Sequence, residues 1–252
     1  MVSVIVSARH PIQGSPLERN LRKTVGEEHE LFIINNSAGQ ASLASIYNFG
    51  VEKANGEILV FMHDDAFLMT RGWGNVLVKK FSQQPDLGII GVAGTQYLFE
   101  DNRSWTAAGS PFIKGRVVHH LENGDFFMTL FSSEKGDQEV VCCSGVFMAV
   151  RREVFTTIGF DESVFDSFCF HDIDFCLQAR KNWRCMVTTD ILVKHRSVGT
   201  FGEKWEHYGS QLLQKHAPDL PASCTDLVPN HHNPQTIHVV DLKGKMSQET
   251  IT

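Results

Sequence analysis

Short β-branched runs alternate with helical patterns over the first ninety residues, and this alternation constrains the fold more than any other feature of the sequence. The strand-like runs are residues 2–8, 30–35, 57–62 and 88–93, and the helical patterns are residues 17–25, 42–54 and 73–83. Strands that alternate with helices form βαβ units, with parallel strands and right-handed connections. The sequence therefore predicts an α/β fold with a mainly parallel central sheet flanked by helices.

The rest of the chain is less regular. Glycines punctuate residues 96–140, which we expect to form a looped insertion with small antiparallel pieces such as residues 115–119. The further expected elements are a strand-like run over residues 139–150, helices near Arg152 and Asp172, and strands over residues 185–189 and 193–195. The end of the chain is polar, so we expect a single domain over residues 1–220 and a loosely held tail over residues 221–252.

Charge and composition argue against several classes of protein. The chain has 23 basic and 29 acidic residues, a formal net charge of −6, so we expect no nucleic-acid partner, which would need a broad basic surface. The N-terminus lacks the features of a signal peptide, and no stretch reaches the roughly 18 apolar residues of a membrane span. We therefore expect a cytoplasmic protein and leave peripheral membrane association open. The six cysteines have no CxxC spacing and are expected to be reduced core thiols.

Polar residues follow three of the predicted strands at the point where each strand ends. They are Ser7 and Arg9 after the first strand, Asn35 and Asn36 after the second, and His63, Asp64 and Asp65 after the third. The carboxyl ends of parallel strands meet at one edge of a sheet, where α/β proteins bind their ligands. These residues therefore define one crevice.

The carboxylates of Asp64 and Asp65 have two interpretations. Aspartates in a turn commonly cap the next helix, and this role needs no ligand. Divalent cations such as Mg²⁺, however, are bound by carboxylate and phosphate oxygens together, and the end of a strand in an α/β crevice suits such a site.

Asp172 and Asp174 form a second acidic cluster at the start of an expected helix. Residues two apart on a helix point in different directions, so one carboxylate can face the crevice while the other binds a neighbour. A carboxylate at a helix start suits a general base, although a solvated helix start would give the same spacing. His195, which follows a strand, is either a hydrogen-bonded structural residue or a metal ligand.

In their order along the chain, these clusters and the motifs between them resemble the family-two-like glycosyltransferases of the GT-A fold. The resemblance covers about residues 1–216 and is closest to the bacterial subgroup related to the streptomycin-biosynthesis protein StrF. The motifs that carry it are VSVIVSAR, IINNS, SIYNFGVEKANGEILVFMHDDAFL, GIIGVAGTQYL with Trp105 downstream, SGVFMAVRREVF, FDESVFDSFCFHDIDFCLQARKNWRC and VKHRSVGTF. It implies a small antiparallel part beside the mainly parallel sheet.

The resemblance implies a glycosyltransferase that moves a sugar from a nucleotide-diphosphate sugar, with a UDP-sugar favoured, to a saccharide or other hydroxyl acceptor. It implies a Mn²⁺ or Mg²⁺ cofactor with Asp65 and His195 as ligands. The residues expected to hold the donor nucleotide are Ser7, Arg9, Asn36 and Asp64. Polysaccharide biosynthesis in a bacterium is the setting that it favours.

In such an enzyme Asp172 would be the base of an inverting displacement. The cation would neutralise charge on the diphosphate leaving group while Asp172 deprotonates the attacking hydroxyl. Trp105, Phe112 and the aromatic residues of 165–170 would form an apolar platform for the acceptor.

Three positions depart from the family's usual pattern. Asn35 and Asn36 stand where an aspartate commonly binds the nucleoside, Cys143 to Gly145 lacks an aspartate before its glycine, and His171 replaces an acidic or aromatic residue. These departures bear on nucleotide and acceptor preference.

Other classes of protein remain open from the residues. A catalytically silent nucleotide-sugar-binding protein is supported by the altered positions and predicts no turnover. A nucleotidyltransferase of similar fold would normally have a Gly-rich basic loop after the first strand, whereas Arg9 is the one Lys or Arg between residues 8 and 17. A metal phosphohydrolase would need further ligands before His171, for which His119 and His120 are the nearby candidates.

Overall fold

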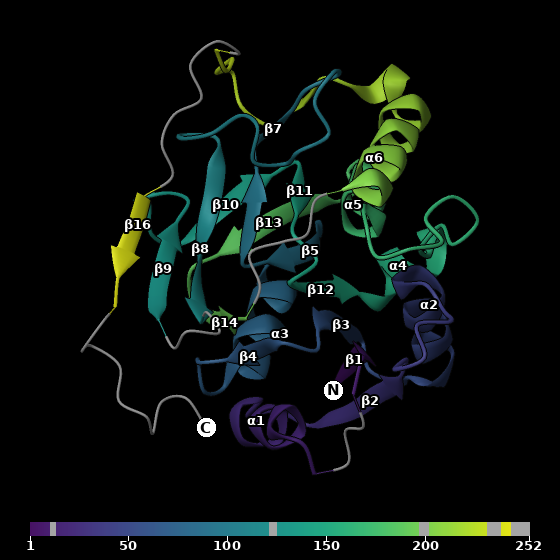
Figure 1. Ribbon diagram of the computed structural model, residues 1–252. Coiled ribbons are helices and arrows are strands. Elements are labelled where there is room, and N and C mark those ends of the chain that lie inside the picture. Colours follow the sequence, from purple (N-terminus) through teal and green to yellow (C-terminus); the bar gives the residue numbers. More distant parts are fainter. Residues whose placement is uncertain (11–13, 121–124, 197–201, 231–237, 243–252) are drawn as a thin grey trace.

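The centre of the computed structural model is a seven-stranded mixed sheet (Figure 1). The structure describes residues 1–10, 14–120, 125–196, 202–230 and 238–242. The strands lie in the order β10 (Asp137–Val140), β13 (Arg184–Thr188), β5 (Leu87–Gly91), β12 (Phe147–Arg151), β3 (Ile58–His63), β1 (Val2–Ala8) and β2 (His29–Asn35). β10 and β12 are antiparallel to their neighbours, and the other strands run parallel to one another. The predicted mainly parallel sheet is therefore confirmed.

Helices cover both faces of this sheet. α1 (Pro16–Thr24) and α3 (Trp73–Gln83) pack on one face, and α2 (Leu43–Lys53), α4 (Arg152–Ile158) and α5 (His171–Ala179) pack on the other. Side chains alternate in direction along a strand, so Val4 and Val6 of β1 join the core beside α1 and α3, while Ile5 joins the core beside α2 and α5. Leu212 of α6 (Glu203–Lys215) also packs in the core beside α2 and α5.

Local sequence signals set the starts of two helices. The side chains of Ser15 and Ser42 accept hydrogen bonds from the backbone N–H groups of Glu18 and Ser45, which pairs donors that the first turns of α1 and α2 leave free. Pro16 stands in the first turn of α1, where its missing N–H costs no hydrogen bond. The observed limits of both helices lie within one residue of those predicted.

A second seven-stranded sheet lies beside the central one, on the left of Figure 1. Its strands are β11 (Cys142–Cys143), β6 (Ala93–Thr95), β8 (Ile113–His120), β14 (Val193–His195) and β4 (Ala66–Leu68), with β9 (Phe126–Leu130) beside β8 and β16 (His238–Asp241) beside β9. All these pairs are antiparallel except β14 with β8. This sheet is the antiparallel part that the resemblance implied, but with seven strands it is larger than the small part expected.

Two predicted strands are divided between the two sheets. The run over residues 88–93 becomes β5 and β6, because the chain leaves the central sheet at Val92, and the run over residues 139–150 becomes β10, β11 and β12. The residues on either side of each change of sheet are buried, so their apolar pattern continues and periodicity alone does not reveal the change.

Parts of the predicted C-terminal tail pair with the body of the protein. A short 3-10 turn (Ala217–Asp219) follows α6, β15 (Ala222–Ser223) pairs with β7 (Tyr97–Leu98), and β16 pairs with β9. Residues 231–237 and 243–252 of this region lie outside the described residues. The division into a domain over residues 1–220 and a tail over residues 221–252 stays a prediction.

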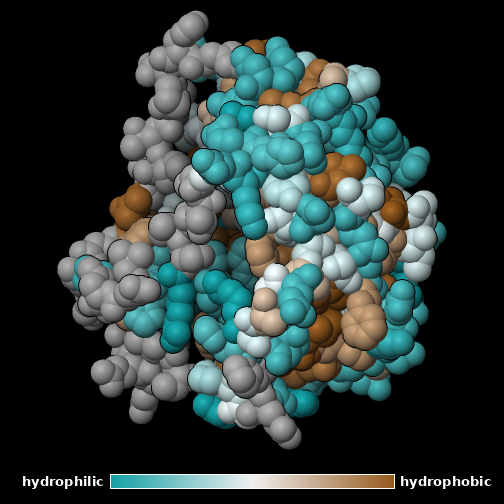
Figure 2. All heavy atoms as spheres, turned by 45° about the vertical axis from the view of Figure 1, so that its right-hand side comes forward, coloured by the Kyte–Doolittle hydropathy of each residue, from teal (hydrophilic) through white to brown (hydrophobic). Residues whose placement is uncertain are grey.

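Core and surface have the distribution usual for a globular chain. All six cysteines are free thiols, and four of them, Cys142, Cys143, Cys176 and Cys185, are buried. Hydrophilic residues cover most of the face shown in Figure 2, with hydrophobic residues in separate patches among them. Within the described parts of the chain, we find no helix with the length and apolar character that crossing a bilayer requires.

Candidate active site

The carboxyl ends of β1, β2 and β3 lie side by side, as the predicted crevice requires. In the parallel register Ser7 lies opposite His63, and Ala8 lies opposite Asn35. β4 begins directly after the acidic turn that follows β3, and its antiparallel pairing with β14 sets His195 opposite Ala66. Residues that are far apart in the sequence therefore meet at one edge of the central sheet.

Arg9 binds the acidic pair that follows β3. Its backbone N–H donates to Asp64 Oδ2 at 2.8 Å, and its guanidinium Nε donates to Asp64 Oδ1 at 2.9 Å. The guanidinium Nη2 lies 3.2 Å from Asp65 Oδ2. Hydrogen bonding to Asp64 raises the pKa of Arg9 above its usual value, so the guanidinium stays charged.

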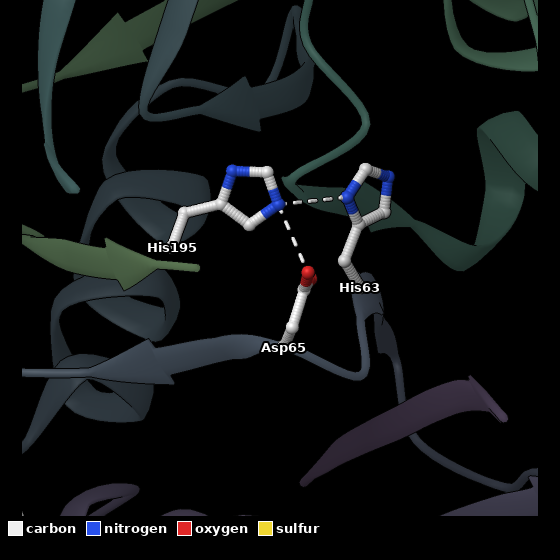
Figure 3. Close-up of side chains that lie close together, drawn as sticks. All are labelled: His63, Asp65 and His195. Atoms are coloured by element: carbon white, nitrogen blue, oxygen red, sulfur yellow. Dashed lines mark hydrogen bonds and ion pairs between the residues drawn. The ribbon is translucent and has the colours of Figure 1, made fainter. Parts of the chain in front are cut away.

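Three side chains, His63, Asp65 and His195, point toward one another in Figure 3. His195 Nε2 lies 3.2 Å from His63 Nδ1 and 3.2 Å from Asp65 Oδ1. One potential ligand atom from each residue lies within 4.8 Å of the others. Asp65 and His195 were both predicted from the sequence as metal ligands, and the structure brings them together. His63 was not predicted as a ligand, although it precedes Asp65 by two positions and ends the same strand.

The protonation of this cluster suits the binding of a cation. Burial and the nearby His195 lower the pKa of His63 to about 4, so its imidazole is neutral at pH 7. Burial alone would raise the pKa of Asp65, but the hydrogen bond with His195 and the nearby positive charges outweigh it and hold that pKa well below its usual range. The cluster therefore offers a neutral imidazole and an ionised carboxylate. Two imidazole nitrogens and a carboxylate oxygen are a donor set that fits a first-row divalent metal ion.

Asp172 lies in the first turn of α5 and is held by two backbone groups. The N–H of Gly145 donates to Oδ2 at 2.6 Å, and the N–H of Ile173 donates to Oδ1 at 2.9 Å. A Cβ atom at position 145 would lie 3.0 Å from Asp172 Oδ2, so this close approach depends on glycine. Gly145 precedes β12, whose antiparallel pairing with β3 brings the segment beside the acidic turn.

The backbone that leads into α5 is strained. Phe170, the residue before the helix, has φ of 65°, a left-handed conformation that is uncommon for a residue with a bulky side chain. Its ring packs against Trp205 with 5.5 Å between centroids. The next residue, His171, is buried with its ring 5.7 Å from that of Tyr47. These contacts keep the start of α5, and hence Asp172, in one position.

The second aspartate of the cluster, Asp174, points away from the crevice. It is fully buried and accepts from His216 at 2.7 Å and from Gln178 at 2.9 Å, and Lys215 lies 2.8 Å from it. It therefore ties α5 to the end of α6. The spacing of the two aspartates predicts that one can face the crevice while the other binds a neighbour, and this is the arrangement that the structure has.

A cavity of about 540 Å³ opens between Asp172 and the histidines of the cluster. Its wall includes Asp172, His63 and His195 together with aromatic side chains from four segments of the chain. Trp105, Phe168 and Phe170, which were predicted as an acceptor platform, line it. Phe112 does not, because it packs in a separate small core with Phe99, and Phe165 is fully buried.

The predicted donor-binding residues Ser7, Arg9 and Asn36 do not line this cavity, and neither do the predicted donor-binding residue Asp64 and the predicted metal ligand Asp65. Ser7 is 7% exposed at the end of β1. The side-chain amide of Asn36 donates to the carbonyl of Ala41 at 2.9 Å and accepts from the N–H of Ala41 at 3.3 Å, so it shapes the loop before α2. Arg9 is the most exposed of the three, with its side chain 58% accessible.

Comparison with known protein families decides the class of this chain. Residues 13–216 match the Glycosyltransferase like family. The chain belongs to this family. Membership confirms the predicted enzyme class, that of the glycosyltransferases.

Two curated proteins are related to this family member in sequence. The chain is 22% identical over 213 residues to the uncharacterized protein y4gI of Sinorhizobium fredii. It is 25% identical over 160 residues to the O-antigen biosynthesis protein RfbC of Myxococcus xanthus. These matches cover 71% and 61% of this chain but 22% and 12% of the relatives, so it spans a small part of their length.

Solved glycosyltransferase structures share the fold of this family member. GalNAc-T7, solved with UDP, GalNAc and Mn²⁺, has a TM-score of 0.56 at 11% identity and covers 85% of this chain and 47% of its own. TarS of S. aureus has a TM-score of 0.55 at 12% identity, over 89% and 40%. The mannosyltransferase PcManGT of Pyrobaculum calidifontis, in complex with GDP-Man and Mn²⁺, has a TM-score of 0.52 at 15% identity, over 88% and 65%. The predicted GT-A fold is confirmed.

Proposed function

We propose that the protein is a metal-dependent glycosyltransferase that moves a sugar from a nucleotide-diphosphate sugar to a hydroxyl acceptor, with inversion at the anomeric carbon and Asp172 as the base. The observation that carries the proposal is one cavity with Asp172 on its wall and with His63 and His195 of the cation-binding cluster on the same wall. Displacement at a sugar–phosphate bond needs both a base and a stabilised leaving group at one site.

The residues that would hold the cation are His63, Asp65 and His195. A donor set with two imidazoles suits Mn²⁺ better than Mg²⁺, which prefers oxygen ligands. When bound, a divalent cation supplies Lewis-acid stabilisation of the charge that develops on the diphosphate. The Mn²⁺ in the solved structures of GalNAc-T7 and PcManGT supports this choice.

Ser7, Arg9, Asn36 and Asp64 are the proposed donor-binding residues. The exposed guanidinium of Arg9 lies beside the acidic turn, where it can form charge-assisted hydrogen bonds with diphosphate oxygens. Asn36 would act indirectly, by keeping the loop after β2 in its conformation. Its side-chain nitrogen and oxygen both form hydrogen bonds with the backbone of Ala41. UDP with GalNAc-T7 and GDP-Man with PcManGT support a nucleotide-sugar donor, and we propose a UDP-sugar first.

Asp172 is positioned to accept the proton of the acceptor hydroxyl. In the step that we propose, the hydroxyl oxygen bonds to the anomeric carbon, the bond from that carbon to the phosphate oxygen breaks on the opposite face, and the hydroxyl proton passes to Asp172. A carboxylate has about four lone-pair sites, so the bonds from Gly145 and Ile173 leave one free on each oxygen.

The biological setting follows from the relatives and from the motif series. The match to the O-antigen biosynthesis protein RfbC supports a role in bacterial cell-surface polysaccharide synthesis. The closer relationship to the StrF-related subgroup and the cytoplasmic location stay predictions from the sequence.

A panel of UDP-, GDP- and dTDP-sugars, scored by release of the nucleoside diphosphate, tests this function. We expect release from at least one donor with Mn²⁺, weaker release with Mg²⁺ and none after chelation with EDTA. Release that is unaffected by EDTA would contradict metal dependence. Binding of nucleotide sugars without release from any of them would instead identify a catalytically silent binding protein.

A further inference from the structure

Aromatic side chains form most of the cavity wall that lies beyond Asp172. They come from the loop before β8, from β9 and the residue after it, from the segment before α5 and from α6. The aromatic residues of this wall are Trp105, Phe127, Phe131, Phe168, Phe170 and Trp205. A cavity of about 540 Å³ is within the usual size range of small-molecule sites.

Packing fixes several of these rings before any ligand arrives. The ring of Trp105 meets that of Phe131 at 5.3 Å and 63°, and the ring of Trp205 lies 5.5 Å from that of Phe170. Phe168 differs from them because it is 48% exposed. A ligand that covered Phe168 would remove apolar surface from water, and the rings already fixed by packing would add contact at little cost in side-chain order.

Hydroxyl groups stand beside the aromatic wall. Ser104 and Thr106 flank Trp105 in sequence, line the same cavity and share a hydrogen bond of 2.9 Å. Aromatic faces next to hydroxyl groups match a ligand that has one apolar face and an edge of hydroxyls. A pyranose ring has this character.

The charges on the aromatic side of the cavity, apart from the cation-binding cluster of His63, Asp65 and His195, disfavour an anionic ligand. Among the described residues of its wall, Arg103 is the one Lys or Arg side chain. It is already paired with Glu206, donates to Ser210 Oγ at 3.1 Å, and lies 5.4 Å from the ring centroid of Trp205. The carboxylate of Asp172 on the same wall would repel a phosphate.

We propose that this aromatic wall is an acceptor subsite for an uncharged sugar ring, such as the terminal residue of a neutral glycan, and that phosphorylated acceptors are excluded. The inference rests on the proposed function, since it assigns the acceptor to the cavity that contains Asp172. It adds the chemical class of that acceptor and names Phe168 as a residue that determines specificity.

The test compares methyl glycosides of common hexoses with their 6-phosphates, and with citronellyl phosphate as a short prenyl phosphate. Binding to the full chain is measured by saturation-transfer NMR, independently of turnover. We expect saturation transfer to at least one neutral glycoside and none to its 6-phosphate or to citronellyl phosphate. Equal or stronger binding of a phosphorylated compound, or no binding of any glycoside, would overturn the inference.

Two phenylalanines of similar exposure provide a matched pair of variants. Phe168→Ala removes an aromatic ring from the cavity wall, and Phe49→Ala removes a ring that is 51% exposed on α2, outside the cavity. Neither ring is part of the buried core, so both variants should fold. The dissociation constant of the neutral glycoside should rise about fivefold in Phe168→Ala, as expected for one lost ring contact, and should not change in Phe49→Ala. Equal affinities in the two variants would contradict the role of Phe168.

A second readout separates this inference from the proposed function. Release of nucleoside diphosphate is followed with and without each acceptor. Selective binding of neutral glycosides without release of nucleoside diphosphate from any donor would support the sugar subsite and contradict the proposed transferase activity. Release that only phosphorylated acceptors accelerate would confirm a transferase and overturn the neutral subsite.

Discussion

The backbone N–H of Gly145 donates to the Oδ2 atom of Asp172 at 2.6 Å and thereby connects the loop before β12 to the first turn of α5. One partner lies two residues before a strand of the central sheet, and the other lies on the helix that carries the proposed base. The contact is close enough that a side chain at position 145 would disturb it. The position of the Asp172 carboxylate therefore depends on glycine at position 145.

Gly145→Ala is predicted to slow transfer. The added Cβ would lie 3.0 Å from Oδ2 and 3.3 Å from Cγ of Asp172, so the carboxylate must shift. We expect kcat to fall roughly 10- to 100-fold, because small displacements of a catalytic group are costly. Gly202→Ala is the matched control, since a Cβ there meets nothing within 4 Å and its backbone is extended with φ of 165°. Equal kcat in the two variants would show that the contact does not position the base.

Removal of either histidine of the cluster is predicted to weaken Mn²⁺ binding. Loss of a partner outside the ligand shell commonly costs 10–100-fold in metal affinity, so loss of a direct ligand in His63→Ala or His195→Ala should raise the dissociation constant at least about 10-fold. Calorimetric titration of EDTA-treated protein with Mn²⁺ measures this directly. His207→Ala, on the exposed face of α6, should bind Mn²⁺ as the wild type does. Wild-type affinity for Mn²⁺ in both His63→Ala and His195→Ala would show that neither histidine is a metal ligand.

Asp174→Ala is predicted to destabilise the fold strongly. Its carboxylate is fully buried against His216 and Lys215, and removal of one partner from a buried ionic network typically costs about 3–5 kcal/mol. Urea unfolding measures the change. Asp226→Ala is the control, because this aspartate is exposed and its replacement should change stability by less than about 1 kcal/mol. Similar losses in the two variants would mean that the buried network does not hold α5 to α6.

Asp161 is predicted to contribute to the loss of stability in acid. Burial would raise its pKa, but hydrogen bonds from Lys215 and Ser163 outweigh burial and lower the pKa from 3.8 to about 2. A depressed folded-state pKa stabilises the fold above the unfolded value, and this contribution disappears as pH falls from about 4 to 2. Asp161→Asn should therefore be less stable than the wild type at pH 6, with a difference that shrinks toward pH 2. Urea midpoints that differ equally at both pH values would contradict this origin.

Local patterns were sufficient to predict most of the central sheet. Val4, Ile5 and Val6 of β1 are buried on both faces, and such continuous apolar runs identify strands covered by helices. The apolar run over residues 88–93 is divided between two sheets at Val92. Periodicity does not reveal this division, because the residues on both sides of Val92 are buried.

The grouping of Asp65 with His195 was implied by the family resemblance and not by their positions along the chain. Asp65 follows β3 and His195 ends β14, and the pairing of β14 with β4 brings the two residues together. The contribution of His63 depends on the 3.2 Å approach of His195, which lies 132 residues away, and that of Gly145 depends on the pairing of β12 with β3. Such long-range contacts are set by tertiary packing and cannot be derived from spacing.

The central claim, that Asp172 is the base, is tested most directly by the kcat of Asp172→Asn under donor saturation, together with calorimetric binding of the nucleoside diphosphate and Mn²⁺. The asparagine side chain keeps an oxygen that can accept from Gly145 but cannot take up the hydroxyl proton. We predict that kcat falls by about 10²–10⁴-fold while the affinity for nucleoside diphosphate stays within about twofold. A kcat within a few-fold of the wild type would contradict the assignment.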